Sequence, residues 1–205
     1  MIVLNFKRYP EATGTNAVRL AAICKKLSLE FGIPIIPVPE VSDLKSCIDQ
    51  GIDCWTQKFE PNALNQKGTL LNHSDYRLSL KNLQEEVYLS KSRGDKVCIC
   101  TQTSEETREF LQLRPDFLAY EPPELIGSET TSVAQAKPEV IGEAARACKE
   151  AGIPLLVGAG VKSAQDVVVS LNQGATGVIL ASAVMRAADQ ELEVRELAQA
   201  FKNRT

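Results

Sequence analysis

Short apolar runs rich in β-branched residues alternate with longer amphipathic stretches along all 205 residues. This alternation is typical of parallel strands joined by crossover helices, because neighbouring parallel strands cannot be linked by a tight turn. Eight strands are predicted, at Ile2–Phe6, Ile33–Val38, Asp53–Phe59, Gly68–Asn72, Lys96–Cys100, Phe117–Tyr120, Pro154–Val157 and Gly177–Leu180. Seven helices are predicted, at Asn16–Phe31, Val41–Gln50, Leu78–Arg93, Glu105–Leu113, Pro138–Ala151, Ala164–Gln173 and Glu191–Lys202.

This pattern predicts an α/β protein, a closed (β/α)8 barrel, and 205 residues lie at the small end of the range for that fold. An open doubly wound sheet is the alternative, but no GxGxxG motif follows the first strand, so a dinucleotide-binding version has little support. No linker rich in Pro, Gly or Ser divides the chain. We therefore expect one domain over residues 1–205.

The connection between the third and fourth strands is unusually short. Only EPNALNQK, residues 60–67, separates them, whereas a crossover between parallel strands usually needs a dozen or more residues. We expect one barrel helix to be missing here and its flank to be covered by something else, such as another subunit, because its absence should leave apolar barrel wall exposed.

Charge and composition exclude several classes of protein. With 23 basic and 26 acidic residues the net charge is -3, which gives no basic surface for nucleic acid or anionic lipid. No segment approaches the 18 or so apolar residues of a membrane span, and MIVLNFKRYP reverses the order of a secretory signal. A cytoplasmic location is expected. The single histidine cannot complete a zinc site with cysteines that lack CxxC spacing, so no metal is expected and the six cysteines are interpreted as buried thiols.

Polar residues gather at the predicted carboxyl ends of three strands, which share one mouth in a barrel. Asn5 and Lys7 end the first strand, His73 follows the fourth and Glu121 follows the sixth. PPELIGS, which follows Glu121 with a stiff start and a flexible finish, has the composition of a hinged lid. Each of these residues has an ordinary structural explanation when taken alone, and a lone histidine is more often structural than catalytic. Their joint placement favours an active site.

Two turns of small residues, Gly158-Ala159-Gly160 and Ala181-Ser182-Ala183, follow the seventh and eighth strands. Small side chains let backbone N–H groups approach an anion, and barrels often bind phosphate with these two loops. Each turn alone is a weak signal. At successive strand ends they predict a phosphate site.

The motifs NFK, NHSDYR, AYEPPELIG, AKPEVI, GAG and LAS, in this order, resemble triosephosphate isomerases of the archaeal type over nearly the whole chain. The resemblance implies a TIM barrel that interconverts the triose phosphates dihydroxyacetone phosphate and D-glyceraldehyde 3-phosphate in glycolysis and gluconeogenesis, with no metal or organic cofactor.

By that resemblance, Glu121 is the general base that moves a proton through an enediolate, and His73 is the electrophile that donates to the substrate oxygen. A helix start near Ser74 is expected to keep His73 neutral. Lys7 supplies a fixed positive charge, and Asn5 orients it. The remaining substrate and phosphate contacts fall on Ile126, Gly127, Gly160, Ala181 and Ser182.

Three features depart from the family pattern. Asp75 stands where the family has glutamate, which shortens the reach of that carboxylate towards Lys7, and Ala183 stands where archaeal relatives have glycine. The short EPNALNQK connection lacks the long loop that reaches into the neighbouring subunit in relatives. A homo-oligomer is therefore expected through a different surface.

Two other functions remain open on the sequence. A Schiff-base aldolase of sugar phosphates would need a desolvated lysine at a strand end, for which Lys7 is the clear candidate. A barrel that binds phosphate ligands without catalysis would keep the fold but show no turnover.

Overall fold

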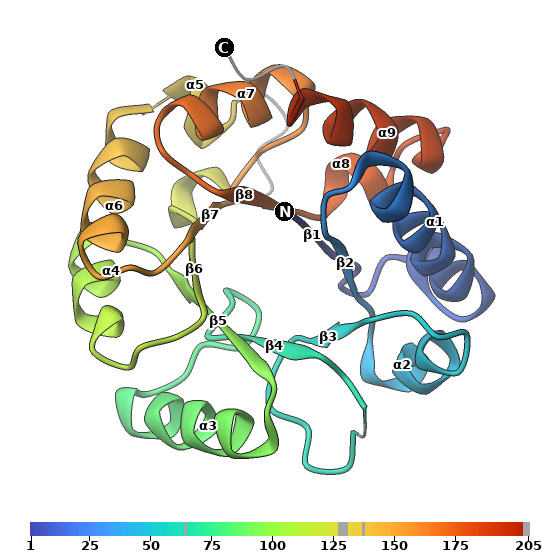
Figure 1. The fold of residues 1–205 in the computed structure, drawn as a ribbon, viewed down its shortest axis with the longest axis horizontal. Helices are drawn as coiled ribbons and strands as arrows, with labels where there is room; N and C mark the ends of the chain where they lie inside the picture. Colours follow the sequence, from blue (N-terminus) through green and yellow to red (C-terminus); the bar gives the residue numbers. More distant parts are fainter. Residues whose placement is uncertain (64, 127–130, 137, 203–205) are drawn as a thin grey trace.

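The computed structural model describes residues 1–63, 65–126, 131–136 and 138–202. Its eight strands form one parallel sheet, ordered β2-β1-β8-β7-β6-β5-β4-β3, with helices around it (Figure 1). The strands are β1 (Ile2–Asn5), β2 (Ile35–Val38), β3 (Trp55–Thr56), β4 (Gly68–Leu71), β5 (Lys96–Thr101), β6 (Phe117–Tyr120), β7 (Leu155–Val157) and β8 (Gly177–Leu180). The predicted (β/α)8 barrel is confirmed.

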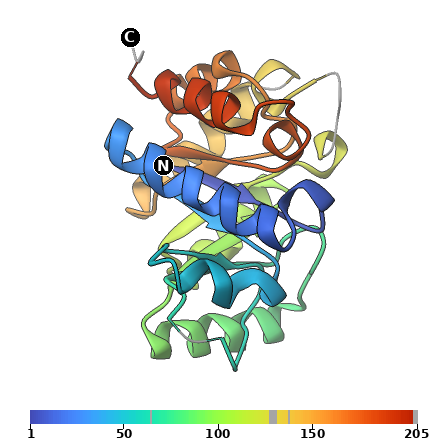
Figure 2. The ribbon, with the colours of Figure 1, turned by 90° about the vertical axis from the view of Figure 1, so that its right-hand side faces the viewer.

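All seven predicted helices are present, with ends shifted by a few residues. They are α1 (Thr15–Phe31), α2 (Val41–Ile48), α3 (Leu80–Arg93), α4 (Ser104–Leu111), α6 (Pro138–Glu150), α7 (Ala164–Asn172) and α9 (Gln190–Ala200). The sequence reading missed two short helices and two 3-10 turns, namely α5 (Val133–Ala136), α8 (Ser182–Met185), η1 (Pro10–Ala12) and η2 (Pro123–Leu125). In the side view of Figure 2, α1 and α9 pack together across one flank of the barrel. None of the helices in the described part of the chain is long and apolar enough to span a membrane.

Successive strand residues divide between two apolar clusters, as the pleat requires. On β1, Ile2 and Leu4 pack outwards against the helices, whereas Val3 points into the barrel. The interior cluster consists of Val3, Val38, Trp55, Leu70, Cys98, Cys100, Ala119, Leu156 and Ile179. All six cysteines are buried free thiols, as expected. The barrel interior is thus a packed core, and the side chains just beyond it form the floor of the mouth.

The third strand is shorter than predicted, with two residues in place of Asp53–Phe59. It forms a ladder with β4, where Trp55 lies opposite Gly68. Within the described residues no ladder joins it to β2, although the two strands are in contact. A strand hydrogen-bonded on one side only has fewer bonds to hold it extended, so the chain leaves the sheet at Gln57.

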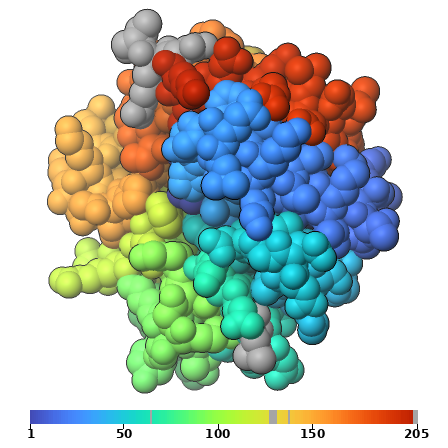
Figure 3. All heavy atoms as spheres, turned by 45° about the vertical axis from the view of Figure 1, so that its right-hand side comes forward, coloured from blue at the N-terminus to red at the C-terminus, as the bar shows by residue number. Residues whose placement is uncertain are grey.

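The predicted missing helix is confirmed over residues 57–63 and 65–67, which hold no helix; Figure 1 shows a looped connection between α2 and α3. The expected exposed barrel wall is not found, because the outward-facing Thr69 and Leu71 of β4 are fully buried. Side chains of α3 cover this wall together with the connection, which lies beside α3 on the surface (Figure 3).

Arg93, at the end of α3, holds that connection in place. Its Nη1 donates to the carbonyls of Glu60 at 2.8 Å and Ala63 at 3.3 Å, and its guanidinium lies 4.6 Å from the centre of the Phe59 ring. Its Nε donates to Asp95 at 2.8 Å. The Arg93 side chain thus helps to hold the connection against the barrel, where a helix would otherwise cover it.

Candidate active site

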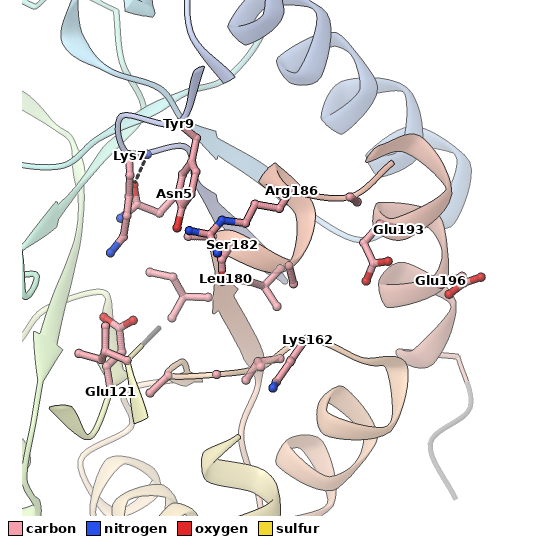
Figure 4. A pocket seen from close by; sticks show the side chains of 18 of the residues that line it. Asn5, Lys7, Tyr9, Glu121, Lys162, Leu180, Ser182, Arg186, Glu193 and Glu196 are labelled. Carbon is pink, nitrogen blue, oxygen red and sulfur yellow. Dashed lines mark hydrogen bonds between the residues drawn. The ribbon is translucent and has the colours of Figure 1, made fainter. Parts of the chain in front are cut away.

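A cavity of about 670 Å³ opens at the carboxyl ends of the strands (Figure 4). Asn5, Lys7, His73 and Glu121 line it, as do the two predicted phosphate turns. The structure therefore brings together residues from β1, β4, β6, β7 and β8 that are far apart in the sequence. Of the predicted site residues, Gly127 lies outside the described part of the chain.

Asn5 and Lys7 form a compact pair at the end of β1. Lys7 has φ +46°, which is uncommon for a residue with a side chain, and its N–H donates to Asn5 Oδ1 at 3.2 Å. The other end of the Asn5 amide, Nδ2, lies 3.4 Å from His73 Nε2. Asn5 is 1% exposed, and its orientation is fixed by the hydrogen bond that its Oδ1 accepts from the Lys7 N–H. The bent backbone turns the Lys7 side chain towards the cavity.

The tautomer of His73 follows from one hydrogen bond. The N–H of Asp75 donates to His73 Nδ1 at 3.2 Å, so Nδ1 acts as an acceptor. In a neutral ring the proton then lies on Nε2, the nitrogen that is 3.8 Å from Glu121 Oε2. The predicted helix start near Ser74 is wrong, because α3 begins at Leu80, and residues 74–79 form a short turn followed by irregular chain. A local backbone N–H, not a helix terminus, selects the donor nitrogen.

Asn72 fixes the segment that carries His73, and the sequence reading missed it. This residue is buried with φ +59°. Its Nδ2 donates to the carbonyl of Cys100 on β5 at 3.0 Å, and its Oδ1 accepts the N–H of Leu78 at 2.9 Å. Asparagine tolerates the left-handed conformation better than most residues, which is the only sequence signal for this role.

The shorter acid at position 75 still reaches its partner. Asp75 Oδ2 lies 3.3 Å from Lys7 Nζ and 3.6 Å from His73 Nδ1. The loss of one methylene relative to glutamate therefore leaves the ion pair intact.

Glu121 is buried, and its carboxylate lies close to the backbone of Gly158. It is 7% exposed, and no described residue donates a hydrogen bond to its Oε2. A Cβ added to Gly158 would lie 2.6 Å from Glu121 Oε1 and 2.7 Å from its Cγ, so only glycine leaves room for this carboxylate. Burial first, and then the Glu121 charge, raises the pKa of the Cys98 and Cys100 thiols well above the usual value. The surroundings of Glu121 on this side are therefore uncharged.

Two turns form the other end of the cavity. Ala159 (φ +66°) and Gly160 (φ +73°) follow each other in the left-handed region, and both line the cavity. Ala181 and Ser182, before and at the start of α8, line the same end. Ala183 lies within α8, where a methyl group is compatible with the backbone.

Ile126 lines the cavity as predicted, but its N–H donates to the carbonyl of Pro123 at 3.3 Å. In the described residues no group of three or more His, Cys, Asp and Glu side chains could hold a metal ion.

The family model for triosephosphate isomerase matches residues 60–201. Triosephosphate isomerase of Methanothermus fervidus is 38% identical over 96% of this chain and 96% of its own. That of Methanocaldococcus jannaschii is 34% identical over 96% of this chain and 98% of its own.

Solved structures at lower identity share the fold. Thiamine phosphate pyrophosphorylase from Pyrococcus furiosus is 14% identical with a TM-score of 0.68, covering 98% of this chain and 94% of its own. A tryptophan synthase alpha-subunit from the same organism is 15% identical with a TM-score of 0.66, covering 97% of each chain. The identities above 30% over nearly full length, together with the family match, show that this chain belongs to the triosephosphate isomerase family.

Proposed function

We propose that the chain interconverts dihydroxyacetone phosphate and D-glyceraldehyde 3-phosphate through an enediolate, with Glu121 as the base. The observation that carries this proposal is the pairing of a buried carboxylate, whose Oε2 accepts no hydrogen bond from a described residue, with an imidazole Nε2 at 3.8 Å on the same cavity. A base and a donor so placed can act on adjacent carbons and oxygens of one small substrate.

Each residue has a distinct part in the proposed reaction. Glu121 takes a proton from one substrate carbon and, after its carboxyl exchanges with solvent, delivers a proton to the neighbouring carbon. His73 donates from Nε2 to the oxygen on which negative charge develops, and Lys7 stabilises that charge as a fixed cation. Asn5 holds the turn at Lys7 by accepting its N–H. No metal or organic cofactor is needed for this proton transfer.

The phosphate of the substrate is proposed to bind at the opposite end of the cavity, against Gly160, Ala181 and Ser182. The consecutive left-handed residues Ala159 and Gly160 support this, because their N–H groups suit an anion. Ile126 would contribute an apolar contact, since its N–H is already bonded. The assignment of Gly127 to this site stays a proposal from the family resemblance.

A coupled isomerase assay tests the proposal. Purified chain should convert glyceraldehyde 3-phosphate well above background, and Glu121→Gln should lower kcat by at least about 100-fold, the usual contribution of a positioned base. Glu85→Gln, an exposed glutamate on α3, is the matched control and should keep wild-type kcat. Absence of turnover in the folded wild type, or an unaltered rate in Glu121→Gln, contradicts the proposal.

The aldolase alternative has less support. A Schiff base needs a neutral lysine in apolar surroundings, whereas Lys7 is paired with Asp75 at 3.3 Å. Borohydride with a sugar phosphate should therefore leave the mass of the protein unchanged. A covalent adduct on Lys7 would favour the aldolase.

We further propose a single catalytic domain over residues 1–205 that works in the cytoplasm as a homo-oligomer. Three apolar side chains of α3, Leu80, Tyr88 and Leu89, are 42%, 70% and 37% exposed and support self-association through this helix. The six buried free thiols fit a reducing compartment. Light scattering that gives a monodisperse monomer at micromolar concentration contradicts the oligomer.

A further inference from the structure

Asp166 is a buried carboxylate that the proton transfer does not use. It is the third residue of α7 and is 1% exposed. Its Oδ2 accepts the N–H groups of Lys162 and Ser163, both at 3.1 Å, and the hydroxyl of Ser163 at 2.9 Å. In return, the N–H of Asp166 donates to the Ser163 hydroxyl at 3.2 Å. These bonds form a capping box, an ordinary device for starting a helix.

The second oxygen of Asp166 binds a different segment. Oδ1 accepts the Ser132 hydroxyl at 2.7 Å and the Gln135 side-chain amide at 2.9 Å, both at the beginning of α5. The Ser132 hydroxyl in turn accepts the N–H of Gln135 at 3.1 Å. The cap of α7 uses only Oδ2. The bonds of Oδ1 are not part of the cap. They attach α5 to α7, which lie side by side in Figure 1.

The attached segment lies directly on the turn that follows β7. The N–H of Val133 donates to the carbonyl of Ala159 at 3.1 Å. A Cβ added to Gly160 would lie 2.6 Å from the carbonyl oxygen of Thr131 and 3.0 Å from the Cα of Ser132. The turn is therefore enclosed on one side by the start of α5, and on the other it continues into the Lys162–Ser163 backbone that Oδ2 holds.

We propose that Asp166 is a positioning residue for the phosphate end of the cavity, holding the Ala159–Val161 turn between its two hydrogen-bonded arms. This inference rests on the proposed function, because it assigns the turn to the substrate phosphate. Asp166 itself does not line the cavity, whereas Ala159, Gly160 and Val161 do. Asp166 acts through the backbone that it fixes. It keeps the N–H groups of the Ala159–Val161 turn in place for the substrate phosphate before the substrate binds.

The energetics favour a preorganising role. A buried carboxylate is costly unless hydrogen bonds compensate it, and five donors converge on this one. Hydrogen bonds to a charged acceptor are stronger than neutral ones, so each arm resists displacement of the turn.

The two arms can be perturbed separately. The double variant Ser132→Ala, Gln135→Met deletes the donors to Oδ1, whereas Ser163→Ala removes one donor from the capping side and is the matched control. Asp166→Asn is the second variant, in case the double variant does not fold. Calorimetry with 2-phosphoglycolate, steady-state kinetics with glyceraldehyde 3-phosphate and with D-glyceraldehyde, and thermal unfolding are measured for each.

The double variant and Asp166→Asn should raise the Kd for 2-phosphoglycolate and the KM for glyceraldehyde 3-phosphate about tenfold, and more than Ser163→Ala does. Turnover of D-glyceraldehyde, which lacks the phosphate, should stay at the wild-type value. A lower melting temperature with unchanged Kd and KM would overturn the inference, as would equal losses with both substrates. Wild-type protein without isomerase activity would instead overturn the proposed function, and the 2-phosphoglycolate affinities would still decide the role of Asp166.

Discussion

Replacement of Gly158 by alanine should displace the Glu121 carboxylate. The added Cβ would lie 2.6 Å from Glu121 Oε1 and 2.6 Å from Ile179 Cγ2, whereas ordinary contacts begin at 3.4 Å. The carboxylate must therefore move by about 0.8 Å, because Ile179 blocks the opposite direction. A displacement near 1 Å can cost about 100-fold in rate, or about 2.7 kcal/mol in the barrier. Gly158 does not have a positive φ, so alanine would be strained by the contacts of its Cβ and not by its backbone conformation.

The coupled isomerase assay on Gly158→Ala measures this effect as kcat, with circular dichroism to establish folding. Overpacking should also cost about 1–3 kcal/mol of unfolding free energy. Gly142→Ala on α6 is the matched control: its new Cβ would lie 3.2 Å from the movable end of Gln173, and alanine favours the helix. The control should keep wild-type kcat. A kcat for Gly158→Ala close to that of the control would show that the Glu121 carboxylate is not displaced.

Substitutions at three further positions test the packing of the short connection, the pH dependence of stability and the ion pair of Lys7. Arg93→Met should lower the unfolding free energy by about 3 kcal/mol and Tm by about 6–12 °C in thermal melts, because it leaves buried Asp95 without its cation, while kcat stays the same. Burial raises the pKa of Glu86 above the ordinary glutamate value of 4.5. The folded state therefore loses stability as the pH rises above 4.5 and Glu86 must ionise in its buried position. In urea titrations Glu86→Gln should therefore be more stable than wild type at pH 7, and the difference should vanish below pH 4.5; a constant difference would contradict this. Asp75→Ala should change stability by no more than about 1 kcal/mol but lower kcat/KM about tenfold by releasing Lys7, whereas Asp75→Glu should keep wild-type kinetics.

The barrel could be predicted because its signals are local. Strand and helix periods, glycines past helix ends and the strand-end positions of Asn5, His73 and Glu121 are all visible in the sequence. The length of β3 could not be predicted, since it depends on the absence of a hydrogen-bonded neighbour on one side. The cover over β4 was also missed, because it relies on Arg93 reaching back to residues 60 and 63.

The details of the site depend on contacts between distant segments. The helix after His73 begins at Leu80 and not near Ser74, where the Asn72 side chain accepts the N–H of Leu78 and closes the intervening residues into a loop. The need for glycine at position 158 arises from Glu121, 37 positions earlier on another strand. The sequence indicates that Glu121 and Gly158 lie at strand ends, but it contains no signal that the two residues are in contact.

Proton transfer by Glu121 can be measured as the incorporation of deuterium from solvent into the product. Glyceraldehyde 3-phosphate is incubated with the wild-type chain in D2O, and the product is followed by proton NMR. The wild-type chain should give dihydroxyacetone phosphate with deuterium on the carbon that receives the proton, and Glu121→Gln should give negligible product. Labelled product at the wild-type rate from Glu121→Gln, or wild-type product that never carries deuterium, would contradict it.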